Sequence, residues 1–110
     1  MPDSLHDLVA ALRQFARERD WERFHSPKNL ASALVVEAGE LLEPFQWLTE
    51  DQSRRLEGVA RDAVAAEMAD VLLYLLQLSA ALNVDLVAAA QAKMNANALK
   101  YPVPRPADAP

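Results

Sequence analysis

Apolar residues recur at helical spacing along most of the chain and divide it into four predicted helices. The first runs from Leu5 to Arg19 with Ser4 as its N-cap, because its apolar residues share one helix face. Ser26 followed by Pro27 is typical of the cap and first turn of a second helix, which should continue until Pro44 disturbs it. The segment "RDWERFHSP" between the two helices is predicted to be a loop.

The second half of the chain contains the most apolar helix. After a second predicted loop, "FQWLTEDQS", the pattern becomes helical at about Arg54 and continues to Leu82, with Gly58 as a weak point where the segment can break in two. The last predicted helix is "LVAAAQAKMNANALK", with Asp85 as its N-cap and Pro102 closing it.

Residues 71–78 are apolar on more than one face of the predicted third helix. A helix that is apolar all round must be buried all round, and four helices of one subunit barely provide that cover. The run "VLLYLLQLSAALNV" contains polar interruptions and is shorter than the roughly 20 residues that span a bilayer, so we expect a core helix and no membrane. The pattern thus predicts an all-α fold, a four-helix bundle completed by homo-oligomerisation.

Composition supports a single helical domain. The chain has 110 residues, 52% of them hydrophobic, and only 2 glycines among many strong helix formers. We expect one domain over residues 1–102 and a flexible, Pro-rich tail over residues 103–110. The net charge of -5 argues against a nucleic acid polymer as partner, and the lack of cysteine excludes disulfides and thiolate sites. A cytoplasmic location is compatible with this composition and with an N-terminus that lacks a secretory signal.

Two acidic pairs occur among apolar neighbours. Glu37 and Glu40 lie three residues apart in the second helix, and Glu67 and Asp70 repeat this spacing in the third. Residues three apart share a helix face, so antiparallel packing of the two helices would bring four carboxylates together. At an effective dielectric near 20, each like-charged pair about 5 Å apart repels by roughly 3 kcal/mol. Such a group requires a cation or raised pKa values.

The ligand chemistry of these pairs favours Mg2+, with Mn2+ as a possible substitute. Carboxylate oxygens suit these hard ions, and Mg2+ usually binds together with substrate phosphates. The alternative is that the four acids are solvated surface positions, as most acidic residues are. Their apolar surroundings favour the metal site.

The motif E-x-x-E followed by E-x-x-D resembles the signature of the MazG-like, all-α nucleoside triphosphate pyrophosphohydrolases. The flanking stretches "RDWERFHSPKNLA", "LVVEAGELLEPFQW", "EMADVLLYLLQLSAALNVDL" and "KMNANALKYP" are similar to the dCTP pyrophosphatase branch, and the resemblance covers roughly residues 8 to 102. It implies Mg2+-dependent hydrolysis of a (deoxy)nucleoside triphosphate, dCTP or a modified dCTP, to the monophosphate and pyrophosphate. That reaction would remove noncanonical or surplus nucleotides from the nucleotide pool. It also implies a MazG-like bundle that assembles as a dimer or a dimer of dimers.

The resemblance implies roles for individual residues. Glu37, Glu40, Glu67 and Asp70 would be the catalytic, metal-binding acids. Residues that would bind substrate are Trp21, His25, Asn29, Trp47, Tyr74, Lys93, Asn97, Lys100 and Tyr101. An aromatic face can stack on any nucleobase, and cationic groups suit a triphosphate. One alternative is that Trp21 and Trp47 pack at the edge of the core and that Tyr74 belongs to the core. Another is that His25 is a capping or surface residue. Lys93, Asn97 and Lys100 could form a solvated stripe.

Two competing functions follow from the same residues. A non-catalytic helical module for oligomerisation or regulation could keep the acids as a structural Mg2+ site. A di-iron bundle is disfavoured because neither acidic pair is followed by His at the Glu-x-x-His spacing.

Overall fold

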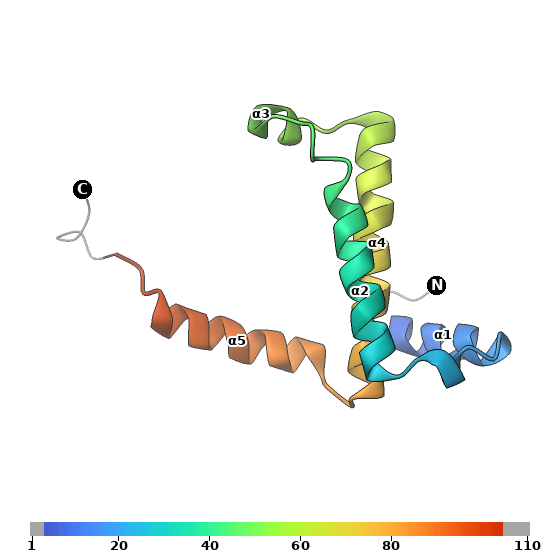
Figure 1. The fold of residues 1–110 in the computed structure, drawn as a ribbon. Helices are drawn as coiled ribbons and strands as arrows, with labels where there is room; N and C mark the ends of the chain where they lie inside the picture. The colour runs from blue at the N-terminus through green and yellow to red at the C-terminus, as the bar shows by residue number, and fades with distance from the viewer. Residues whose placement is uncertain (1–3, 105–110) are drawn as a thin grey trace.

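The computed structural model describes residues 4–104, and within this range it contains only helices and their connections. The all-α prediction is therefore confirmed (Figure 1). Of the predicted tail, Val103 and Pro104 are exposed coil, and residues 105–110 lie outside the described range.

Three helices begin where their capping residues predict. Helix α1 (Leu5–Glu18) is capped by Ser4, whose hydroxyl accepts a hydrogen bond from Asp7 N at 3.1 Å. Helix α2 (Pro27–Leu42) has Ser26 as its N-cap and Pro27 in its first turn. Helix α5 (Leu86–Lys100) begins after Asp85, whose side chain accepts from Ala88 N at 3.1 Å. In each case a side-chain oxygen satisfies a backbone donor that the helix leaves free.

The region between α2 and the apolar helix differs from the prediction. The expected loop contains a short helix, α3 (Glu50–Ser53), and α4 (Gly58–Ala81) begins four residues later than expected. Gly58 has a φ of +56°, a left-handed value that only glycine adopts without steric cost. The predicted weak point is thus the start of the helix.

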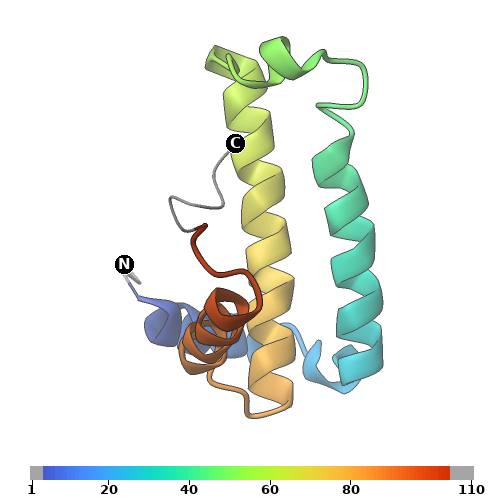
Figure 2. The same ribbon diagram turned by 90° about the vertical axis from the view of Figure 1, so that its left-hand side faces the viewer.

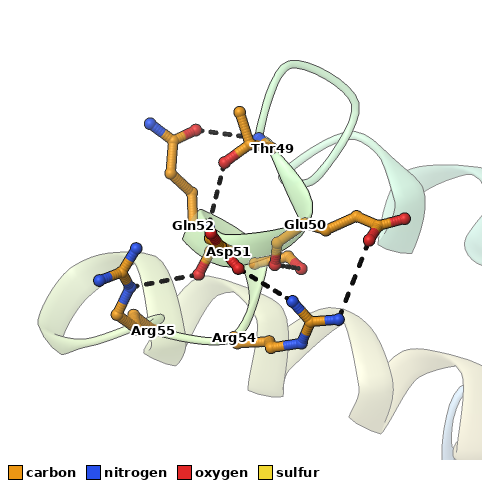
Figure 3. Close-up of polar contacts among 7 residues, drawn as sticks. Thr49, Glu50, Asp51, Gln52, Arg54 and Arg55 are labelled. Atoms are coloured by element: carbon orange, nitrogen blue, oxygen red, sulfur yellow. Dashed lines mark hydrogen bonds and ion pairs between the residues drawn. The ribbon is translucent and has the colours of Figure 1, made fainter.

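Helix α3 is held by contacts among its own residues. The Thr49 hydroxyl accepts from Gln52 N at 3.1 Å, while the Gln52 amide oxygen accepts from Thr49 N at 2.9 Å (Figure 3). Arg54 forms ion pairs with Glu50 at 3.9 Å and with Asp51 at 3.0 Å. This reciprocal capping box explains a helix of only four residues, and its signature T-x-x-Q was present in the sequence.

Helices α2 and α4 lie side by side in opposite directions, and α1 packs across the C-terminal part of α4 (Figures 1 and 2). The most deeply buried apolar side chains join these three helices: Ala16 from α1, Leu30 from α2, and Val64 and Leu76 from α4. Leu76 is only 1% exposed. The core of one chain is therefore small and is concentrated along α4.

Helix α5 projects away from the other helices (Figure 1) and has no buried residue. The turn before it contains Asn83 with a φ of 54°, a conformation that asparagine tolerates better than most residues. One chain thus packs α1, α2 and α4 together and leaves α5 uncovered. The predicted four-helix bundle is not complete within a single chain.

Helix α4 is long and apolar enough to cross a membrane by length and composition alone. The sequence argument measured only the apolar run, whereas the helix that contains it has 24 residues, so that argument from length is wrong. One such helix is weak evidence, because the core helix of a water-soluble protein passes the same test. The expected absence of a membrane partner stays a prediction.

Candidate functional site

The antiparallel packing of α2 and α4 brings the two acidic pairs together. Glu37 and Glu40 lie on α2, while Glu67 and Asp70 lie on α4; we call these four residues the acid cluster. Carboxylate oxygens of Glu37, Glu67 and Asp70 all lie within 4.8 Å of one another. Glu40 lies near them, since its charge raises the pKa values of both Glu37 and Glu67. The three-residue spacing accounts for this arrangement, because it places both members of each pair on one helix face.

Two oxygens of the acid cluster are buried and lack a hydrogen-bond partner within residues 4–104. They are Oε2 of Glu37 and Oε2 of Glu67. A buried polar atom without a partner is costly, and buried polar atoms in native proteins are nearly always hydrogen-bonded. These two oxygens therefore point to a ligand that completes the site.

Burial and mutual repulsion raise the pKa values of both residues. Burial of the carboxyl group is the largest cause for Glu37, followed by its hydrogen bond with Glu40 and by the charges of Glu40, Asp70 and Glu67. For Glu67, burial again raises the pKa most, followed by the charges of Glu40, Asp70 and Glu43. A bound cation would remove the reason for protonation, because it favours the charged form of every nearby carboxylate.

The donor set fits a divalent cation that prefers oxygen. All four side chains of the acid cluster offer carboxylate oxygens, and the chain has no cysteine. Mg2+ and Mn2+ take such ligands, and Mg2+ commonly uses a few carboxylates together with water and substrate phosphates. The buried oxygens of Glu37 and Glu67 that lack a hydrogen-bond partner are placed to coordinate such an ion.

A pocket of about 380 Å³ lies between α1 and α4, beside the acid cluster. It brings together four of the predicted site residues, Trp21, His25, Asp70 and Tyr74. Its other walls are mainly apolar and come from α1 and α4. A cavity of this size with a few convergent polar groups is typical of a small-molecule site. Asp70 belongs to both the pocket and the acid cluster, so the pocket adjoins the cluster at this residue.

The loop between α1 and α2 positions the aromatic wall of this pocket. Trp21 N donates to Ala16 O at 2.9 Å, and the Trp21 ring meets Phe15 edge to face with centroids 5.5 Å apart. The short 3-10 helix η1 (Glu22–Phe24) follows, and His25 N donates to Glu22 O at 3.0 Å. These local bonds fix the backbone of the loop, and Trp21 and His25 line the pocket together with residues of α4.

Six other predicted substrate residues lie outside this pocket within the chain. Asn29 uses its side-chain amide to donate to Phe24 O at 3.0 Å, which fixes the loop. Trp47 follows α2 and is 87% exposed. The remaining four are exposed and lie on the projecting α5 or directly after it: Lys93, Asn97, Lys100 and Tyr101. Their roles in substrate binding stay predictions.

Gln77 was missed as a site residue. It lies on α4 and lines the pocket together with Tyr74 and Asp70. The sequence showed it only as a polar interruption of an apolar run. The available signal was its position three residues after Tyr74 and seven after Asp70, which places all three on one face of α4.

This chain is similar to a known family, to named relatives and to a solved structure. The MazG-like family matches residues 33–109. The chain is 46% identical over 102 residues to dCTP pyrophosphatase 1 of Mus musculus and 45% identical over 101 residues to that of Homo sapiens. These matches cover 91% and 90% of this chain but only 60% and 59% of the two relatives, so the chain spans about three fifths of their length. The fold is similar to that of a pyrophosphatase from Archaeoglobus fulgidus, with a TM-score of 0.81, 37% identity, and coverage of 94% of this chain and 96% of the other.

Proposed function

The chain belongs to the MazG-like family, and from this we propose that it is a Mg2+-dependent nucleoside triphosphate pyrophosphohydrolase. Its substrate would be dCTP or a modified dCTP, and its products the monophosphate and pyrophosphate. The observation that carries the proposal is the pair of buried, unpartnered oxygens on Glu37 and Glu67. These residues share the acid cluster with Asp70, which lines a pocket of suitable size. The names of the mouse and human relatives support the choice of dCTP. We further propose a cytoplasmic role in keeping surplus or modified nucleotides out of the pool.

Each part of the site has a task in this proposal. Glu37, Glu40, Glu67 and Asp70 would hold Mg2+, with Mn2+ as a possible substitute. When bound, the ion would neutralise phosphate charge and help to orient the attacking water. Trp21, His25 and Tyr74 would enclose the nucleoside in the pocket between α1 and α4. One of the four carboxylates would also accept the proton of the attacking water.

The functional unit in this proposal is a homo-oligomer, a dimer or a dimer of dimers. Large apolar side chains are exposed on α2, α4 and α5: Val35, Val36, Met68, Leu72, Val87, Met94 and Leu99. Exposed apolar residues that gather into a patch mark a protein–protein contact. A second copy would cover this surface and could bring Trp47 or the polar residues of α5 to the site. Light scattering should therefore show a species larger than the 12.1 kDa chain, and a monomer at working concentration would contradict the assembly.

The test of the activity is product identification. The purified chain is incubated with Mg2+ and a panel of canonical and modified (deoxy)nucleoside triphosphates, and the products are separated. We expect the monophosphate and pyrophosphate, formed fastest from a cytosine deoxynucleotide. Release of single phosphates would contradict the reaction. A lack of turnover on every substrate would instead favour a non-catalytic helical module with a structural metal site.

A further inference from the structure

Gln77 occupies the part of the pocket that lies away from the acid cluster. Asp70 marks the end of the pocket where phosphates would meet the cation. Gln77 lies seven residues further along α4, nearly two helical turns, which corresponds to a rise of about 10 Å on the same face. A nucleoside extends over a comparable length from its 5′ oxygen to the far edge of its base. Gln77 therefore lies where it would contact the edge of a base.

The amide of Gln77 is held in one orientation. Its Nε2 donates to Leu73 O on the same helix at 3.2 Å, and the side chain is half-buried. Rotating the amide by half a turn would place Oε1 against the carbonyl oxygen of Leu73, so two acceptors would face each other. Within the described residues Oε1 of Gln77 takes no hydrogen bond, so it is left as a free acceptor on a residue that lines the pocket, beside the second N–H of Nε2.

A fixed acceptor distinguishes two classes of base. Cytosine and adenine carry an exocyclic amino group that donates, whereas uracil and thymine carry a carbonyl oxygen at the corresponding edge. An amino group would satisfy Oε1, while a carbonyl oxygen would leave it unpaired in a half-buried site. Of the other polar side chains that line the described pocket, Asp70 belongs to the acid cluster. His25 and Tyr74 can each donate a hydrogen bond as well as accept one.

We propose that Gln77 is a specificity-determining residue, which accepts a hydrogen bond from the exocyclic amino group of the base and so selects cytosine over uracil. This inference rests on the proposed function for the identity of the ligand class. It assigns base selection to a residue outside the acid cluster and outside the aromatic wall.

The experiment compares wild type with Gln77→Met, which keeps a straight side chain of good helix propensity but removes the amide. Binding of dCMP and of dUMP is measured by calorimetry, and kcat/KM is measured for dCTP and dUTP. Gln14→Met is the matched control, because Gln14 is exposed on α1 and its amide bonds, among residues 4–104, to Glu18 and Arg17 alone. Circular dichroism verifies the fold, and Gln77→Ala is carried alongside in case the Met variant does not fold.

We expect the dCMP preference of wild type to fall about tenfold when the Gln77 amide is removed, through weaker dCMP binding, and to stay unchanged in the Gln14 control. A preference within about twofold of wild type would overturn the inference, as would wild type that binds dCMP and dUMP equally. Turnover decides the proposed function separately. If no triphosphate is hydrolysed but the dCMP preference depends on Gln77, the base-reading role stands and the pyrophosphohydrolase activity fails.

Discussion

The acid cluster and the α3 turn, residues Thr49 to Arg55, contain the same kinds of acidic side chain in opposite circumstances. Glu50 and Asp51 are 92% and 78% exposed at their side chains, and both are paired with Arg54 (Figure 3). Oxygens of Glu37 and Glu67 are buried and have no partner within the described chain. The comparison shows that acidic residues close together do not by themselves indicate a site. Burial without a partner is the feature that does.

The largest expected difference between the two regions is in catalysis. Glu40→Gln or Asp70→Asn should reduce kcat/KM for dCTP by at least about 100-fold, because even residues that only support metal ligands contribute 10- to 100-fold. The helical circular dichroism spectrum should be retained, since both substitutions preserve shape.

Asp51→Asn is the matched control, because Asp51 lies in the α3 turn and pairs with Arg54 at the surface. Its activity should stay close to that of wild type. Near-normal turnover by either acid-cluster variant would contradict the assignment of metal ligands.

Mg2+ should raise the thermal stability of the chain through the acid cluster and not through the α3 turn. At a free Mg2+ concentration about 100 times its Kd, linkage stabilises the folded state by about 2.7 kcal/mol, which corresponds to a rise in Tm of about 10 °C for a domain of this size. Thermal denaturation with and without Mg2+ measures this, with NaCl matched for ionic strength. The rise should disappear in Glu67→Gln and persist in Asp51→Asn; an unchanged wild-type Tm at saturating Mg2+ would count against a shared cation site.

The pH dependence of stability should carry the signature of the acid cluster in the absence of divalent metal. The pKa values of Glu37 and Glu67 are raised in the folded chain above their ordinary value of 4.5, so the folded state binds these protons more tightly than the unfolded chain. This contribution to stability is complete below pH 4.5 and is lost as the pH rises through the raised values.

Glu67→Gln removes one of the two carboxyl groups that bind a proton more tightly in the folded state than in the unfolded state. The Tm of wild type minus that of Glu67→Gln should therefore decrease as the pH rises above 4.5. A difference that stays constant or increases with pH would show that Glu67 is not destabilised by ionisation.

The smallest effects are expected in the α3 turn. Thr49→Ala removes the capping box and should cost about 1 kcal/mol, while Arg54→Met should change stability by no more than about 1 kcal/mol because its ion pairs are exposed. Chemical denaturation with urea measures both. A loss of several kcal/mol in Arg54→Met would mean that the α3 turn is integral to the fold.

Local signals in the sequence predicted much of this fold. Ser4, Ser26 and Asp85 cap helices as expected, because capping depends on a side chain and the backbone of its own first turn. The α3 helix was missed although T-x-x-Q is a capping signature, because four residues give no hydrophobic periodicity to detect. The course of α5 could not be predicted, since its direction depends on the turn at Asn83 and not on the pattern of its own residues.

The candidate site was likewise predicted only in part from the sequence. The spacing of Glu37, Glu40, Glu67 and Asp70 predicted which side chains could share a face, and the packing of α2 against α4 brings them together. Gln77 was missed because its importance comes from α1 lying opposite it, a tertiary contact that α4 alone does not encode. The orientation of its amide, set by Leu73 O, depends on side-chain geometry.

The position of the far end of α5 is sensitive to the backbone of the turn at Asn83. A helix of 15 residues is about 22 Å long, so a rotation of about 10° at its base moves its far end by about 4 Å. The backbone of the turn that contains Asn83 therefore affects how far from the body of its own chain α5 presents Lys100 and Tyr101. Substitutions at Asn83 would change the reach of this arm without altering any residue along it, so two sequences with identical α5 helices could assemble with different geometry.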